Sequence, residues 1–410
     1  MLGVQAQAAS AACVSRADAC GANASDRPGD TTADRVASAT AGDLTGVKAI
    51  ATGTTHSLAL MADGTVRAWG NNNSGQLGDG TTTNRTTPVV VAGLTGVRAI
   101  ATGDNHSLAL MAGGTVRAWG NNDYGQLGDG TTTNRTSPVV VAGLTGVRAV
   151  ATGGNHSLAL MADGTVRAWG FNRFGQLGDG TTTTNRTSPV VVAGLTGVKA
   201  VAVSVVHSLA LMADGTVRAW GNNEFGQLGD GTRNNRSIPV TVRGLTGVRT
   251  IAAGAFHNLA LIAGGTVRTW GLNDFGQLGD GTTTNRSTPV GVPGLTGVRA
   301  IDGSIHSLAL MADGTIRAWG LNRFGQLGDG TRVNRSTPVT VVGLTGVKAI
   351  ATTVAHSLAL MTGGTVKAWG NNSSGQLGDG TRNNRSTPVT VRGLTGTKTV
   401  APGPRHSLAA

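Results

Sequence analysis

The stretch HSLALMAGGTVRAWGNNDYGQLGDGTTTNRTSPVVV, from His106 to Val141, recurs with small changes along most of the chain, each time followed by a linker like AGLTGVRAV. Two short apolar runs, HSLALM and TVRAWG, flank the pair Gly113-Gly114. This pattern predicts a β-hairpin, because a type I′ turn needs positive φ at both central residues. The loop NNDYGQLGDGTTTNRT is too rich in Gly and Asn for a helix.

The second half of the unit adds two further apolar runs. Pro138 opens the β-branched run VVV, and we expect it at a strand's first residue, where it forfeits no interior ladder bond. The run GVRAVATG, residues 146–153, consists mostly of small residues. Each unit therefore predicts four short strands and no helix.

The period of the repeat is set by seven tryptophans with spacings of 50, 50, 51, 50, 49 and 50 residues: Trp69, Trp119, Trp169, Trp220, Trp270, Trp319 and Trp369. A four-stranded sheet that is apolar on both faces must stack on copies of itself. Four strands in such a period are typical of propeller blades, and rings have roughly 4–8 of them. We expect an all-β, seven-bladed β-propeller over residues 44–393, with no helical domain.

The two ends of the chain differ from the seven units. Residues 394–410 begin an eighth unit and stop after two strands, which either close the ring by displacing the first unit's opening strands or are a surplus. Residues 1–43 are small and polar, and we interpret them as a flexible leader outside the repeat. The small residues from Val4 to Ala9 suggest the remnant of an export signal. Cys13 and Cys20 could pair in an oxidising compartment or stay free thiols in a reducing one.

Composition bounds the class of protein. The net charge is +12, and the basic excess recurs from unit to unit instead of forming one cluster. Rings of Arg could attract an anionic partner, but we favour a solvated rim that keeps a Gly-rich protein soluble. No apolar run approaches the roughly 18 residues of a membrane span. The few Lys, many Thr and Asn, and the Ala-rich leader favour export from a bacterium, with the cytoplasm as the alternative.

Each unit carries one His at the same position, and the set is His56, His106, His156, His207, His257, His306, His356 and His406. Blades hold equivalent atoms apart, whereas the ligands of a zinc ion converge at about 2.0–2.1 Å from it. We therefore expect structural histidines bonded to neighbouring backbone. The Ser after each His lacks the third group of a triad, and G-D-G-T lacks the ligands of a calcium loop. The sequence predicts no catalytic, cofactor or metal site.

The units differ from one another mainly in two loops, the one just before the repeat His and the one just after the repeat Trp-Gly. These loops are candidates for binding a partner, because variable loops on a rigid frame carry specificity. Random drift among copies is the alternative explanation. The candidate residues are Tyr124, Phe171, Arg173, Val205, Val206, Glu224, Phe256, Leu272, Asp274, Leu321 and Arg323. Ser74 and Ser374 replace the aromatic residue of the other units, and these two units would be neighbours in a closed seven-unit ring.

The pattern W-G-x-N followed by G-Q-L-G-D-G in all seven units closely resembles the repeat of the regulator of chromosome condensation family. The resemblance covers about residues 44–410 and implies a seven-bladed ring that acts through protein–protein contacts on its faces. Known members include a nucleotide exchange factor for a small nuclear GTPase, a plant ultraviolet-B photoreceptor and a secreted bacterial inhibitor of β-lactamases.

Departures from these members narrow the expectation. The exchange factor inserts a β-wedge in one blade, for which spacings of 49–51 residues leave no room, and the photoreceptor's extra tryptophans are missing here. The inhibitor's arrangement of variable loops on a fixed ring fits best. We expect a monomeric, non-enzymatic scaffold that binds another protein and not nucleic acid, with an exchange-type regulator of a small GTPase as the alternative.

Overall fold

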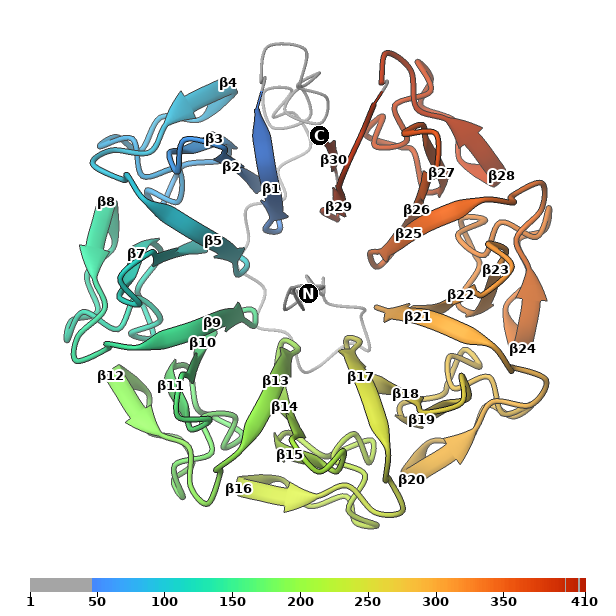
Figure 1. Cartoon of the computed structure of the whole chain (residues 1–410), viewed down its shortest axis with the longest axis horizontal. Helices are drawn as coiled ribbons and strands as arrows, with labels where there is room; N and C mark the ends of the chain where they lie inside the picture. The colour runs from blue at the N-terminus through green and yellow to red at the C-terminus, as the bar shows by residue number, and fades with distance from the viewer. Residues whose placement is uncertain (1–45, 395, 405) are drawn as a thin grey trace.

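The computed structural model describes residues 46–394, 396–404 and 406–410, and in Figure 1 these residues form a ring of blades around a central axis. Seven antiparallel sheets of four strands each follow chain order from the inside of the ring outward. The predicted all-β fold with seven four-stranded blades is confirmed. The leader, including Cys13 and Cys20, lies outside the described residues.

The strands fall into four sets by their place in the blade. The innermost are β1 (Val47–Thr52), β5 (Val97–Thr102), β9 (Val147–Thr152), β13 (Val198–Val203), β17 (Val248–Ala253), β21 (Val298–Gly303) and β25 (Val347–Thr352). The second strands are β2 (His56–Met61), β6 (His106–Met111), β10 (His156–Met161), β14 (His207–Met212), β18 (His257–Ile262), β22 (His306–Met311) and β26 (His356–Met361). The third strands are β3 (Val66–Gly70), β7 (Val116–Gly120), β11 (Val166–Gly170), β15 (Val217–Gly221), β19 (Val267–Gly271), β23 (Ile316–Gly320) and β27 (Val366–Gly370). The outermost are β4 (Arg85–Val90), β8 (Arg135–Val140), β12 (Arg186–Val191), β16 (Arg236–Thr241), β20 (Arg286–Gly291), β24 (Arg335–Thr340) and β28 (Arg385–Thr390).

The hairpin between the second and third strands forms where predicted, but its turn is not type I′. In the first unit only Gly64 has positive φ, at 80°, and its N–H donates to the Met61 carbonyl at 3.0 Å. This is a longer turn that ends in one left-handed Gly, which is a common solution for three-residue hairpin loops. Asp63 stabilises it, because one carboxylate oxygen accepts from both the N–H and the hydroxyl of Thr65.

The prediction that Pro138 begins a strand is wrong by three residues. The strand β8 starts at Arg135, so Pro138 is its fourth residue. A bulge separates the pairs Ala118–Val139 and Gly120–Arg135, and Pro138 lies within this irregular stretch. The outermost strand is an edge, where a missing N–H is tolerated.

The apolar core lies between blades as well as within them. One buried cluster joins Leu158, Val166 and Leu177 of the third blade to Trp220 of the fourth, and equivalent clusters recur around the ring. The seven tryptophans are at most 3% exposed. Each of the first six blades therefore completes its core with the tryptophan of the next blade.

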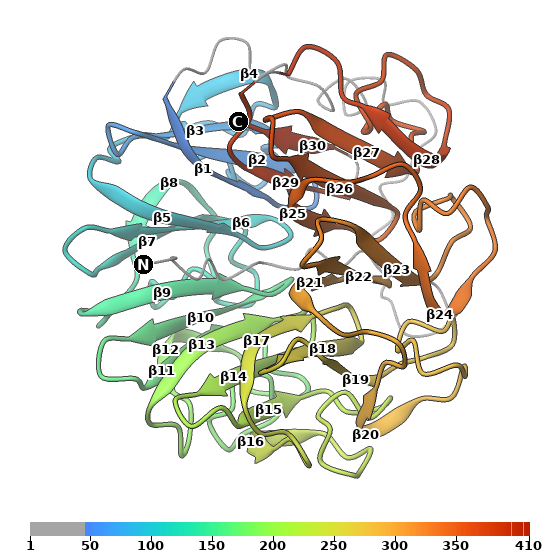
Figure 2. The ribbon, with the colours of Figure 1, turned by 45° about the vertical axis from the view of Figure 1, so that its right-hand side comes forward.

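The partial eighth unit occupies its own sector of the ring. Its strands β29 (Val400–Pro402) and β30 (Ser407–Ala409) pair with each other and lie between β1 and the seventh blade (Figures 1 and 2). The first blade keeps its own β1 and β2, so the eighth unit neither displaces them nor hangs free. A closed ring of seven units would have made the units of Ser74 and Ser374 neighbours. The eighth unit lies between them instead.

Because the four strands of each blade run up and down in sequence order, their connections lie on two faces of the ring, and these faces differ in composition. We name as the variable face the side that carries the loops from first to second strand and from third to fourth strand. We name as the hairpin face the side that carries the turns from second to third strand and the links between units. All the candidate partner-binding residues belong to loops of the variable face.

Candidate functional site: buried polar seams and the variable face

The repeat histidines form a closed circuit of hydrogen bonds between units, at 2.7–3.1 Å. Each Nε2 reaches the residue after the His of the next unit, and the pairs are His56–Ser107, His106–Ser157, His156–Ser208, His207–Asn258, His257–Ser307, His306–Ser357, His356–Ser407 and His406–Ser57. The last pair joins the partial eighth unit to the first. The expected structural role therefore holds, but the partner is a side chain of the neighbouring unit and not backbone.

In six of these pairs the direction of the bond is fixed by the serine, whose hydroxyl donates to the Gln carbonyl of a neighbouring blade. The Ser107 hydroxyl donates to the Gln76 carbonyl at 3.1 Å, so its oxygen must accept a proton from Nε2 of His56. The histidine is therefore neutral and protonated on Nε2. Burial, with the charge of His406 and His106 as smaller causes, lowers the pKa of His56 to about 3.

A buried His–Ser contact resembles the start of a nucleophilic pair, but this one cannot act. Both partners are fully buried, and the serine proton is directed at a carbonyl and away from the imidazole. No carboxylate orients Nδ1 of His56 or His106, which has no hydrogen-bond partner among the described residues. A triad needs a base that receives the proton and a group that orients it.

The G-Q-L-G-D-G loop is held by a second polar network, shown by the second unit. The Asn122 amide donates to Asp129, at 3.2 Å, and to the carbonyls of Thr131 and Thr133, at 3.0 and 3.1 Å. Arg135 pairs with Asp129 at 2.7 Å. Burial alone would raise the pKa of Asp129, but hydrogen bonds from Thr131 and Arg135 outweigh it and lower the pKa. The polar side chains of the motif thus bond to one another and close the loop.

The variable face carries an apolar patch that crosses four blades. We name it the apolar arc: Val205, Ala255, Phe256, Phe275, Ile305, Leu321 and Val354. Ala255, Ile305 and Leu321 are buried within it, at 3–7% exposed, and the other four are half-buried and form its outer side. It brings together three of the predicted residues, Val205, Phe256 and Leu321, from neighbouring blades. Phe256 also packs edge-on against Phe225, with ring centroids 5.6 Å apart. Ile305 and Val354 were not among the predicted residues, although each is an apolar residue close before the repeat His.

A second aromatic group lies where the second and third blades meet. Tyr124 packs on Phe171 with centroids 4.9 Å apart, and Phe171 meets Phe174 edge-on at 6.3 Å. Tyr124 is 38% exposed, so this group is open to solvent. Arg173 lies over the ring of Phe174 at 5.8 Å.

The remaining candidates surround these two groups without joining them. Val206 and Leu272 are half-buried, and Arg173, Glu224, Asp274 and Arg323 are exposed. Arg323 lies over Phe324 at 4.7 Å, as Arg173 does over Phe174. The face therefore combines apolar surface with charges of both signs.

Three apolar residues on this face, Phe171, Leu272 and Leu321, replace an asparagine that makes a hydrogen bond in other units. In the first and seventh units Asn71 and Asn371 accept from the side-chain amide of the loop Gln, at 2.7 and 2.9 Å. Phe171 and Leu321 stand at that position, and the amides of Gln176 and Gln326 have no partner among the described residues. Leaving a buried donor unpaired costs about 1–3 kcal/mol.

The hairpin face surrounds the channel mouth with eight exposed cations at equivalent positions, which are Lys48, Arg98, Arg148, Lys199, Arg249, Arg299, Lys348 and Lys398. At least two of them link blades: Arg98 donates to the carbonyls of Val147 and Arg148 at 3.1 and 2.9 Å, and Arg148 does the same one blade on.

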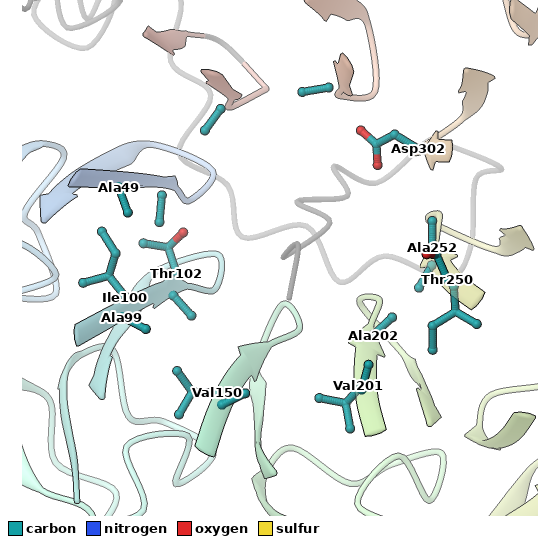
Figure 3. Close-up of a pocket in the computed structure, with 18 of the residues that line it drawn as sticks. Ala49, Ala99, Ile100, Thr102, Val150, Val201, Ala202, Thr250, Ala252 and Asp302 are labelled. Carbon is teal, nitrogen blue, oxygen red and sulfur yellow. The ribbon is translucent and has the colours of Figure 1, made fainter. Parts of the chain in front are cut away.

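The channel holds a cavity of 340 Å³ lined by the innermost strands (Figure 3). One acid stands in its wall, Asp302, where the other units have Ala. Its carboxylate accepts from the N–H and hydroxyl of Thr352, at 2.7 and 3.2 Å. Burial raises the pKa of Asp302 to about 6, although these bonds oppose the shift.

No three His, Cys, Asp or Glu side chains in residues 46–394, 396–404 and 406–410 gather into a group that could hold a metal ion. Within the same ranges, no helix is long and apolar enough to cross a membrane.

Comparisons with known proteins agree with this geometry. The model of the RCC1-like domain matches residues 11–205, and that of the regulator of chromosome condensation (RCC1) repeat matches residues 214–261, 264–310, 313–360 and 363–410. No curated protein is close enough in sequence to count as a match.

Two solved structures superpose over most of both chains. Prp20p from Saccharomyces cerevisiae, described together with its binding to Gsp1p and histones, is 25% identical, with a TM-score of 0.68, and the match covers 85% of this chain and 92% of that one. Human WBSCR16 is also 25% identical, with a TM-score of 0.69, and the match covers 84% and 98%.

Proposed function

Because the chain belongs to the regulator of chromosome condensation (RCC1) repeat family, we propose that it is a non-enzymatic scaffold that binds another protein through the apolar arc. The observation that carries the proposal is the replacement of Asn by Leu321 in the arc; Phe171 makes the same replacement in the aromatic group where the second and third blades meet. The fold would be better satisfied by Asn there, since Gln176 and Gln326 lose their acceptor. Residues kept at a cost to stability are typical of binding sites.

The arc suits a protein partner in its size and its surroundings. It extends over the loops of blades four to seven and is bordered by exposed charges such as Glu224, Asp274 and Arg323. An apolar centre within a polar rim is typical of protein interfaces, in which a few large residues carry most of the binding energy. Phe256 and Leu321 are the expected anchors.

The repeat itself supplies substitutions that the fold tolerates. Asn stands at the Phe256 position in the second and third units, and at the Leu321 position in four units. The double variant F256N/L321N therefore removes the anchors without introducing a residue foreign to the repeat. The control is V140T, at the far end of β8, where Val140 is 51% exposed and three other units have Thr.

The test is capture of proteins from a lysate of the source organism on the immobilised full chain. We expect the wild type and V140T to retain the same protein. F256N/L321N should bind it about tenfold more weakly or worse, which corresponds to a loss of about 1.4 kcal/mol of binding free energy. Equal retention by all three chains would refute the arc as the binding site.

The alternative function is exchange-type regulation of a small GTPase, supported by the likeness to Prp20p, which binds Gsp1p. Capture of a GTPase that is released by added guanine nucleotide would favour it over a passive scaffold. The even unit spacing weighs against it, because no blade carries an insertion that could act on a nucleotide site.

A further inference from the structure

The wall of the channel contains one carboxylate that no described cation neutralises. Asp302 is 9% exposed and lines the cavity, at a position where every other unit has Ala. The ion pairs of the described residues all join the Asp of a G-D-G-T loop to the Arg that begins the outermost strand of the same blade. A buried carboxylate without a cation is costly to the fold, and such groups are typical of binding sites.

A buried hydroxyl without a partner lies across the channel from this carboxylate. Thr102 ends β5 of the second blade, whereas Asp302 belongs to β21 on the opposite side of the ring (Figures 1 and 3). The Thr102 hydroxyl is buried in the wall of the same cavity and has no hydrogen-bond partner among the described residues. The equivalent hydroxyls of Thr52 and Thr352 donate to the Pro402 carbonyl and to Asp302, at 2.9 and 3.2 Å. Thr102 therefore keeps an unused donor and acceptor.

The innermost strands add backbone groups to the wall of the channel. Among the described strands, each innermost strand of the seven complete blades pairs only with the second strand of its own blade, so its other edge faces the channel (Figure 1). A free strand edge presents unpaired N–H and C=O groups. An extended peptide complements such an edge, because it forms hydrogen bonds through its own backbone.

The end of the channel at the hairpin face carries the opposite charge. In the seven complete blades the exposed cation is the second residue of its innermost strand, and Lys199 and Arg249 are among those that line the cavity. Asp302 is the fifth residue of β21, three residues beyond the cation Arg299. At about 3.3 Å per residue, the negative and the positive positions lie about 10 Å apart along the strand. The wall between them consists mostly of Ala, Val and Ile.

This arrangement fits a short peptide with free ends. A free amino end supplies the cation that Asp302 lacks, a free carboxylate suits the cations, and the peptide groups suit Thr102 and the strand edges. Three extended residues span about 10 Å, which matches the separation of the two charges. The cavity of 340 Å³ lies in the range of small-molecule sites, which is about 300–1,000 Å³. A simple amine would leave the cations without an anion, and a simple carboxylate would leave Asp302 without a cation.

We propose that the channel binds a peptide of about three small residues with free ends, its ammonium group on Asp302 and its carboxylate at the cations of the hairpin face. Thr102 forms a hydrogen bond with a peptide group of this ligand. The charged bonds at the two ends fix its orientation, because charge-assisted hydrogen bonds are the stronger ones. The cavity shares no residue with the apolar arc, so this site does not depend on the proposed scaffold function.

The first test compares three peptides on the full chain: trialanine, N-acetyl-trialanine and trialanine amide. Equilibrium dialysis, with the peptide quantified by mass spectrometry, gives the affinity of each. We expect trialanine to bind, and each blocked peptide to bind at least about tenfold more weakly, because each lacks one charged end. No binding of trialanine at up to about 10 mM would overturn the proposal, and so would equal affinity for the three peptides.

A matched pair of variants tests the role of the carboxylate. D302A introduces the residue that every other unit has, so the repeat tolerates it. It should weaken trialanine binding at least about tenfold and leave the binding of N-acetyl-trialanine unchanged. The control D313G removes a carboxylate from the same blade, at an exposed turn position where three units have Gly, and should bind trialanine as the wild type does. Equal affinity of D302A and D313G for trialanine would overturn the proposal.

The variant T102V separates a role in binding from a role in the fold. Val203 stands at the equivalent position of the fourth unit, so Val also fits the repeat. Because the substitution removes a buried hydroxyl that has no partner in the described part of the chain, the melting temperature should not fall. The affinity for trialanine should fall about threefold or more. A lower melting temperature with unchanged affinity would overturn the place of Thr102 in the site.

Discussion

Acidification from pH 7.5 to pH 5.5 should destabilise the ring strongly through its histidines. Burial lowers the pKa of six of the eight to about 3 and that of His207 and His406 to about 4, against an ordinary 6.5. A folded-state pKa below the unfolded value means that the unfolded chain binds more protons in this range. The stability that the neutral, buried histidines contribute is therefore complete above pH 6.5 and is lost as the pH falls towards 4.

The expected size follows from the number of sites. At pH 5.5 each histidine costs about 1.4 kcal/mol of folding free energy, and eight cost about 11 kcal/mol if they act independently. Asp302 works in the opposite direction, because its pKa is raised to about 6 and protonation favours the folded state. Protonation of Asp302 stabilises the folded chain by only about 1 kcal/mol at pH 5.5. The histidines therefore dominate.

Proton uptake on unfolding measures this directly and does not require a two-state transition. At pH 5.5, unfolding in an unbuffered denaturant should take up about six protons net, whereas at pH 7.5 it should take up about one or fewer. H156Q should lower the uptake by about one proton. An uptake below two protons at pH 5.5 would show that the histidines are charged in the folded ring and that the circuit of Nε2 donors is wrong.

Two substitutions test contacts between blades and a third tests a contact within one blade, each by guanidinium unfolding. W169F keeps an aromatic side chain but removes the hydrogen bond to the Gln126 carbonyl, so it should lower the free energy of unfolding by about 1–3 kcal/mol; no change would mean that this bond is not formed. G128A should cost more than about 2 kcal/mol, because φ is +69° and a Cβ would lie 2.9 Å from the indole; a neutral result would contradict this packing. R135A should cost less than about 1 kcal/mol, since the Arg side chain is 34% exposed, and a larger loss would show that the Asp129 pair is more than a surface ion pair.

The fold could be predicted from the sequence because every unit repeats the same solution. The spacing of Trp69 to Trp369 gave the number of blades, and the apolar runs gave the four strands with errors of a few residues. The turn type was missed because Asp-Gly and Gly-Gly fit both a type I′ turn and a longer turn that ends in a left-handed Gly. Pro138 was misplaced because propensity does not show that an edge strand accepts an internal proline.

The site could be predicted only in part, because its residues converge through the ring. Val205, Phe256 and Leu321 were singled out separately as departures from the repeat, and only the closure of the blades brings them into one arc. The His–Ser circuit was missed for the same reason. An adjacent His and Ser look like local partners, whereas each bonds to a neighbouring unit about 50 residues away.

Random drift among the units and selection for binding a partner predict substitutions at different positions of the variable face. Drift should place substitutions where they cost nothing, such as the exposed positions of Arg173 and Asp274. Phe171 and Leu321 do not fit that expectation, because each leaves the loop amide of its unit without the acceptor that Asn supplies elsewhere. Positions that bond across blades are nearly constant in the same units. A change that costs stability and adds apolar side chains to the loops of one face is better explained by a partner than by chance.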